Sequence, residues 1–141
     1  MPTHRWLLLL GSNLAGPERV QRALETLPAL GHATLLTPIE RMPARRDPSR
    51  FYYNALATLD CDLDSDALRA RLKQIETELG RVRDGSGEVA IDIDLLAKQE
   101  NGRWLADPHA LDKREFAHPP ARALIEAAAI AIDMRNTGNE G

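Results

Sequence analysis

The pattern of apolar and polar positions along the chain predicts an alternation of strands and helices. Residues 6–10 form a continuous apolar run that stops at Gly11, which predicts a short central strand buried on both faces. Gly16 and Pro17 then open a segment with apolar residues at helical spacing, at Val20, Ala23, Leu24 and Leu27. The chain is therefore expected to begin with a buried strand followed by an amphipathic helix.

Two more strands and a second helix are predicted next. Residues 33–39 and residues 51–59 have the composition of strands, and alternation within the latter places Tyr52, Asn54 and Leu56 on one face. A firm amphipathic helix then follows and ends at Gly80, with its apolar stripe at Leu68, Leu72, Ile75 and Leu79.

A pair of carboxylates interrupts the apolar run of residues 89–96. Because strand side chains alternate, Asp92 and Asp94 share one face, and Ile91, Ile93 and Leu95 share the other. Adjacent carboxylates repel each other and are costly to bury without a counter-charge, a conflict that a divalent cation such as Mg²⁺ resolves. The alternative interpretation is an edge strand with one solvated face.

The remaining pattern completes the predicted fold. A short strand is expected around Trp104, and Pro119 and Pro120 open a last helix with a core stripe at Leu124, Ala128 and Ile132. The order strand, helix, strand, strand, helix, strand predicts an α+β ferredoxin-like sandwich, with helices on one face of an antiparallel sheet. We expect one domain over residues 1–135 and a frayed tail over residues 136–141.

Composition narrows the classes of function. The chain has 141 residues and a net charge of −3, so we expect neither a nucleic acid nor a membrane partner. Cys61 is the single cysteine, which excludes a disulfide framework, and residues 6–10 are too short for a membrane span or a signal peptide. We therefore expect a cytoplasmic protein.

Basic residues nevertheless gather in two clusters, which suits a small polyanion better than a nucleic acid. One cluster lies in the predicted loop of residues 41–50 and the other at residues 81–83. The alternative is a solvated surface without a ligand.

Five blocks of sequence, in this order, resemble the 6-hydroxymethyl-7,8-dihydropterin pyrophosphokinase family. They are Gly11-Ser12-Asn13-Leu14, Phe51-Tyr52-Tyr53-Asn54-Ala55, Glu76 with Gly80-Arg81-Val82-Arg83, Asp92-Ile93-Asp94-Leu95-Leu96, and Pro108-His109 through Arg114-Glu115-Phe116 to Pro120. The resemblance spans roughly residues 5 to 125. It implies a ferredoxin-like fold and Mg²⁺-dependent transfer of pyrophosphate from ATP to a reduced pterin, and we expect a monomer.

The resemblance also implies roles for individual residues. Asp92 and Asp94 match the ligands of two Mg²⁺ ions that bridge the ATP phosphates, and Arg81 and Arg83 match the pair that faces the phosphates. Further nucleotide contacts are implied at Glu76, Leu95, His109 and Arg114.

The acceptor site is implied by a second group of residues. Tyr52 and Phe116 resemble the aromatic pair that stacks on the two faces of the pterin ring. Asn54 resembles the amide that pairs with the polar edge of the pterin, and Pro43 matches a neighbouring pterin contact.

The loop before the aspartates departs from the family pattern. The segment of residues 84–88 is shorter than the corresponding segment of the family and lacks its usual tryptophan and arginine. Val89 stands where a phosphate-binding arginine would align. Three arginines of the preceding loop are candidates to replace the missing arginine: Arg45, Arg46 and Arg50. A separate ambiguity concerns the later block, in which either Lys113 or Arg114 can be aligned with the family's phosphate-contacting arginine. Two alternatives therefore stay open: a paralogue acting on another pterin-like alcohol, and a non-catalytic pterin- or nucleotide-binding module.

Overall fold

The computed structural model describes residues 3–14, 16–43, 51–82 and 89–135. Strand β1 (His4–Ser12) lies at the centre of a sheet, antiparallel to β4 (Phe51–Cys61) on one side and to β5 (Asp92–Glu100) on the other. Leu7, Leu8 and Leu10 are fully buried, so β1 is covered on both faces, as its uninterrupted apolar run predicts.

The other strands extend the sheet from these neighbours. Strands β2 (His32–Leu35) and β3 (Glu40–Pro43) pair antiparallel with β4, while β6 (Arg103–Ala106) pairs antiparallel with β5 and parallel with β7 (Ile132–Asp133). The order is β2-β4-β1-β5-β6-β7, with β3 beside β4. The first four strands of this order, with one helix after β1 and one after β4, form the predicted ferredoxin-like α+β arrangement.

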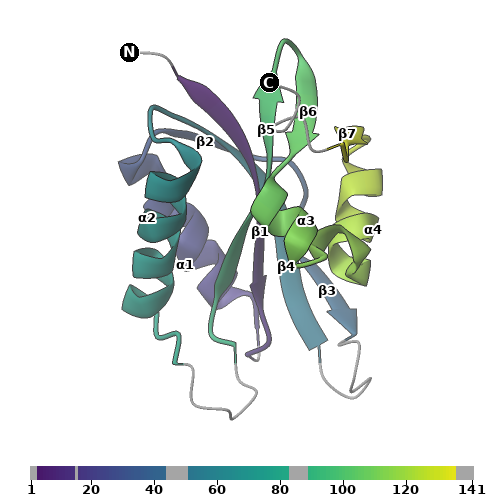
Figure 1. Ribbon diagram of the computed structural model, residues 1–141. Coiled ribbons are helices and arrows are strands. Elements are labelled where there is room, and N and C mark those ends of the chain that lie inside the picture. Colours follow the sequence, from purple (N-terminus) through teal and green to yellow (C-terminus); the bar gives the residue numbers. More distant parts are fainter. Residues whose placement is uncertain (1–2, 15, 44–50, 83–88, 136–141) are drawn as a thin grey trace.

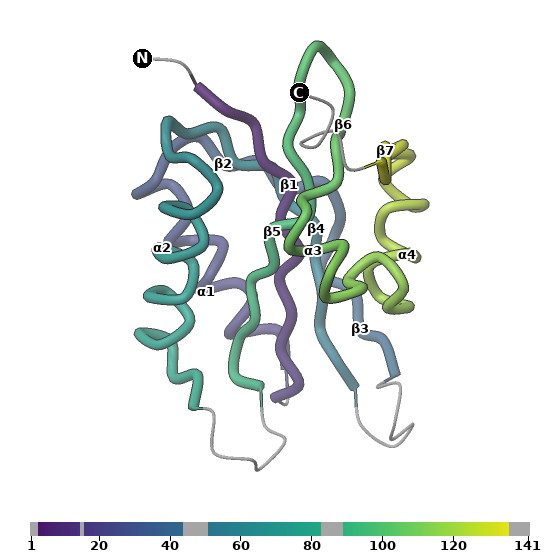
Figure 2. Tube along the Cα trace, in the orientation of Figure 1, coloured from purple at the N-terminus to yellow at the C-terminus, as the bar shows by residue number. Residues whose placement is uncertain are grey.

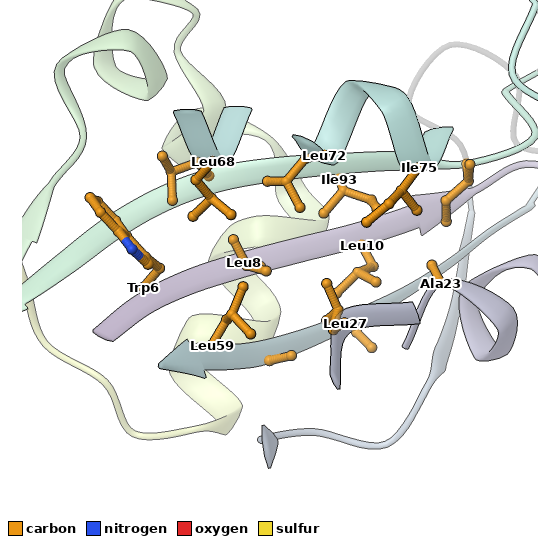
Figure 3. Close-up of a cluster of buried hydrophobic side chains, with 14 of the residues drawn as sticks. Trp6, Leu8, Leu10, Ala23, Leu27, Leu59, Leu68, Leu72, Ile75 and Ile93 are labelled. Carbon is orange, nitrogen blue, oxygen red and sulfur yellow. The ribbon is translucent and has the colours of Figure 1, made fainter. Parts of the chain in front are cut away.

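Two helices cover one face of this sheet. Helix α1 (Glu18–Thr26), which continues into the 3₁₀ turn η1 (Leu27–Ala29), and helix α2 (Ser65–Glu78) lie on the same side in Figure 1. Figure 3 shows their apolar stripes, including Leu27, Leu68 and Leu72, meeting Leu8 and Leu10 of β1. The carboxylate of Asp64 begins α2 by accepting a hydrogen bond from the Ala67 backbone N–H at 2.8 Å.

The opposite face is also covered, which corrects the prediction that helices lie on one face only. It carries α3 (Pro108–Asp112), the 3₁₀ turn η2 (Glu115–Ala117) and α4 (Pro119–Ala127), as Figure 1 shows. Leu124 of α4 packs there with Leu7, Leu9 and Leu56. The second layer forms because the odd-numbered leucines of β1 also need burial.

Several predicted boundaries are wrong. The strand predicted over residues 33–39 ends at Leu35 as β2, because Pro38 has no N–H for a sheet ladder and the Thr37 hydroxyl accepts a hydrogen bond from the Leu56 N–H at 3.0 Å. Strand β3 begins at Glu40 and takes up the first residues of the segment predicted as a loop, residues 41–50. The last helix ends before Ala128, and Ile132 belongs to β7, although both residues still pack against the same core cluster.

None of the helices in the described ranges combines the length and apolar composition that crossing a bilayer requires.

Candidate functional site

Strand β5 presents the predicted carboxylate pair on the face covered by α3 and α4. Asp94 lies opposite Leu9 of β1, and Asp92 lies opposite Gly11. Leu9 belongs to the core cluster of that face, whereas Ile93 and Leu95 pack in the cluster beneath α1 and α2. The prediction that the two aspartates share one face is confirmed.

The half of β5 that carries the aspartates is open along one edge. The β5–β6 ladder involves residues 97–100 of β5 only, so in the described part of the chain no strand pairs with the outer edge of residues 92–95. A shift in the β1–β5 register separates these halves, since Leu8 lies opposite Leu95 but Leu7 lies opposite Ala97. This bulge lets the second half of β5 contribute Leu96 and Ala97 to the core of the α4 face.

A hydrogen bond from β5 to Glu76 connects α2 to this open edge. Its side chain is buried, with 2% exposure, and its carboxylate accepts a hydrogen bond from the Ile93 backbone N–H at 2.7 Å. The bond satisfies a donor that β6 does not reach. Glu76 also lines the pocket described below, so its implied contact with a nucleotide stays a prediction beside this structural role.

A pocket lies between α2, the open half of β5 and the α3–η2 segment. It brings together Asp92, Asp94, Leu95, Glu76 and His109, five of the residues predicted for the metal and nucleotide. Its volume of about 60 Å³ suits ions, waters or a phosphate group but not a whole nucleotide. The remaining side chains of its lining are Arg69, Lys73, Ile93, Ala110, Lys113 and Glu115.

Glu115 adds a third carboxylate that the sequence analysis did not predict. Burial, the charge of Asp92, and both the charge and a hydrogen bond of Glu115 raise the pKa of Asp94 to about 10. A proton is therefore held between these carboxyl groups at neutral pH. The described residues hold no group of three acidic, histidine or cysteine side chains close enough to ligate one metal ion. The neighbouring carboxyl groups of Asp92 and Asp94 would therefore bind a hard divalent cation together with phosphate oxygens of a ligand, with the cation in place of that proton.

The positive charges of the pocket come from α2 and α3. Arg69 is engaged, because its guanidinium donates to Asp66 at 2.6 Å and to both oxygens of Asp107, at 3.1 and 3.2 Å. Lys113 follows α3 and its charge lowers the pKa of Asp94. Lys113 lines the pocket and Arg114 does not, and the implied phosphate contact of Arg114 stays a prediction.

Arg81 lies just beyond α2, outside the lining of this pocket. Its backbone N–H donates to the Glu76 carbonyl at 2.9 Å, and its side-chain Nε is buried without a hydrogen-bond partner in the described ranges. Arg83, the other predicted phosphate-facing residue, lies outside the described residues, as do residues 84–88 and Arg45, Arg46 and Arg50.

Asn54 and Asp92 flank Gly11 in one row across three strands. Gly11 is the register partner of Asn54 on β4 and of Asp92 on β5. Asn54 is 4% exposed, and its Nδ2 has no hydrogen-bond partner among the described residues. A Cβ atom at Gly11 would lie 2.7 Å from the Asn54 Oδ1, so only glycine leaves this amide its place. A buried amide donor without a partner is costly and indicates a ligand position.

The predicted aromatic residues lie on the same face as this row. Tyr52 alternates with Asn54 and Leu56 on β4, and Leu56 packs in the core cluster of the α4 face. Phe116 of η2 packs against that cluster as well. Pro43 lies opposite Phe51 at the end of the β3–β4 ladder. Their contacts with a pterin stay predictions.

Together these features define an α+β protein with a carboxylate- and cation-lined pocket and, one strand row away, a buried amide whose Nδ2 has no partner in the described ranges. A sequence model of the 7,8-dihydro-6-hydroxymethylpterin-pyrophosphokinase (HPPK) family matches residues 7–126. The chain belongs to this family.

Two curated relatives carry the name 2-amino-4-hydroxy-6-hydroxymethyldihydropteridine pyrophosphokinase. The protein from Pseudomonas aeruginosa is 35% identical over 139 residues, which cover 93% of this chain and 83% of the relative. The protein from Haemophilus influenzae is 31% identical over 122 residues, which cover 80% of this chain and 76% of the relative.

Proposed function

We propose that this protein transfers pyrophosphate from ATP to the hydroxymethyl group of 6-hydroxymethyl-7,8-dihydropterin, with Mg²⁺, in folate biosynthesis. The hydroxymethyl oxygen attacks the β-phosphorus, the bond from that phosphorus to the α–β bridging oxygen breaks, and AMP leaves. The hydroxyl proton is released. Family membership and the names of the two relatives support this reaction.

The observation that carries the proposal is the row of Asn54, Gly11 and Asp92. Two strand spacings separate Asn54 from Asp92, which corresponds to roughly 10 Å. A pterin that satisfies the Asn54 amide on β4 would therefore extend its side group over Gly11 toward the carboxylates of β5. This spacing suits the in-line approach of an alcohol to a metal-bound phosphate.

The residues on the nucleotide side would have two roles, metal binding and phosphate binding. Asp92 and Asp94, with Glu115 beside them, would hold the two Mg²⁺ ions, which supply the charge that stabilises the phosphates during transfer. Lys113 and His109 would contact the phosphates from the α3 side, and Arg81, whose buried Nε has no partner in the described ranges, would approach from the end of α2.

Product analysis tests the proposal. The purified protein is incubated with ATP, Mg²⁺ and the hydroxymethyl dihydropterin, and the nucleotides are separated. We expect AMP; ADP would instead indicate simple kinase action. An Asp92→Asn/Asp94→Asn double variant is the matched control, because it keeps the side-chain shape and removes both carboxyl groups that could bind metal.

A non-catalytic binding module is the second candidate. The observation that favours it is Val89 in place of a phosphate-binding arginine. Pterin and Mg-ATP binding without AMP or ADP formation would support the module and contradict the transferase.

A further inference from the structure

One side of α2 forms a wall of the carboxylate pocket. Arg69, Lys73 and Glu76 line it at positions i, i+4 and i+7, which lie on one side of a helix. Leu72 and Ile75 point into the core beneath, so the stripe follows the border between α2 and the open half of β5. Figure 2 shows α2 on one side of the β5 trace and α3 on the other.

The three residues of this stripe differ in the interaction partners of their side chains. Arg69 is bound by two carboxylates, and Glu76 is buried with its carboxylate on the Ile93 N–H. Lys73 is exposed and forms no ion pair within the described ranges, although it borders a pocket with three further carboxylates. Its positive charge at the rim is therefore available to a ligand.

The pocket is too small to enclose a whole nucleotide. With a volume of about 60 Å³, a nucleotide whose phosphate enters the pocket would extend past the rim. Lys73 lies on the α2 side of that rim, across from Lys113 on the α3 side. The Lys73 ammonium group can bind phosphate oxygens there without first breaking an ion pair.

We infer that Lys73 binds the triphosphate of the nucleotide at the rim of the pocket, supplying positive charge that Val89 cannot supply. This inference rests on the proposed function, since it names a further nucleotide-binding residue for the same site.

The experiment compares Lys73→Gln with Arg71→Gln, which removes an equal charge from an exposed position two residues away that does not line the pocket. Binding of an ATP analogue with a methylene bridge between the α and β phosphorus atoms is measured by calorimetry with Mg²⁺. We expect Lys73→Gln to weaken binding on the order of fivefold, Lys73→Glu to weaken it further, and Lys73→Arg to retain it. Arg71→Gln should bind within about twofold of the parent.

The ligand series identifies what Lys73 touches. A phosphate contact predicts a loss for the triphosphate analogue that is absent for adenosine and for the pterin, and a weaker dependence of triphosphate binding on salt. Equal binding by the Lys73→Gln and Arg71→Gln variants, or an equal loss for adenosine, would overturn the inference while AMP formation by the parent left the proposed function intact. A parent that binds no Mg-nucleotide would overturn both.

Discussion

The Glu76 carboxylate accepts a hydrogen bond from the backbone N–H of Ile93 at 2.7 Å, joining the last turns of α2 to the first residues of β5. The bond is buried and ties the strand that carries the metal-binding candidates to the helix that carries Lys73. It also explains why a glutamate stands among the buried positions of α2.

Removing that acceptor should destabilise the protein. We expect Glu76→Ala to lower the free energy of unfolding by about 1–3 kcal/mol, because the Ile93 N–H stays buried without a partner. Glu76→Gln keeps a carbonyl acceptor and should lose less. Urea unfolding at pH 7 measures both, and a Glu76→Ala variant as stable as the parent would contradict this role.

The carboxylates of the pocket predict an unusual pH dependence. The pKa of Asp94 is raised to about 10 by burial, by the charge of Asp92 and by Glu115, so between its ordinary pKa and that value the folded state binds more protons than the unfolded state. Stability of the ligand-free protein should therefore fall as pH rises from about 4 toward neutrality.

Asp94→Asn tests this dependence because it removes the titrating group and preserves the shape. The variant should be more stable than the parent at pH 7, by at least about 1 kcal/mol, and should lose this advantage near pH 4. Thermal unfolding in EDTA across this range is the measurement. Mg²⁺ with nucleotide should stabilise the parent and not the variant; a variant less stable than the parent at pH 7 would contradict the prediction.

Asn54 should matter for ligand binding more than for folding. Its Nδ2 has no partner in the described ranges, so Asn54→Ala should leave the stability of the free protein unchanged within about 1 kcal/mol and weaken pterin binding by about 1–3 kcal/mol. Gly11→Ala should also weaken pterin binding, because the new Cβ displaces the amide. The two losses should not add in the double variant, since both act through one side chain. If the losses of pterin binding free energy add in the double variant, Gly11 does not act through Asn54 and the prediction is wrong.

The departure at Val89 should limit the rate. Val89→Arg should raise turnover, and Arg81→Ala should reduce it strongly, because a donor aimed at developing phosphate charge is worth a few kcal/mol. The Val89 N–H and carbonyl are both bonded to Asn13, so the backbone should keep its position in the variant. Initial rates of AMP formation measure both effects. If Val89→Arg leaves the rate unchanged and Arg45→Ala strongly lowers it, the phosphate contact belongs to the loop of residues 41–50.

Local patterns predicted most of what lies within single elements. Alternation along β4 and β5 placed Asn54 and Leu56 on one face and Asp92 and Asp94 together, because neighbouring side chains of a strand are fixed by the backbone itself. The ferredoxin-like order followed from the sequence of elements for a similar reason, since each connection is short.

What could not be predicted depends on contacts between distant segments. Glu115 meets Asp94 only because η2 folds back over β5, and Glu76 meets Ile93 only because α2 packs along the open half of that strand. Lys113 rather than Arg114 lines the pocket because of the end of α3, where Arg114 has a positive φ of 57° that turns the chain. Pro38 was a visible signal for the break between β2 and β3.

The open edge of β5 has a consequence for solubility. Strands without a neighbour recruit strands from other molecules, and the segment of residues 91–97 would be apolar and strand-forming but for its two aspartates. The negative charge of Asp92 and the polar carboxyl group of Asp94 thus disfavour pairing with a second copy of the segment, and Glu76 already occupies the Ile93 N–H that an incoming strand would need. The side chains proposed to bind metal would then also keep these molecules apart at high concentration, so variants that replace both aspartates with uncharged residues should aggregate more readily even where they unfold less readily.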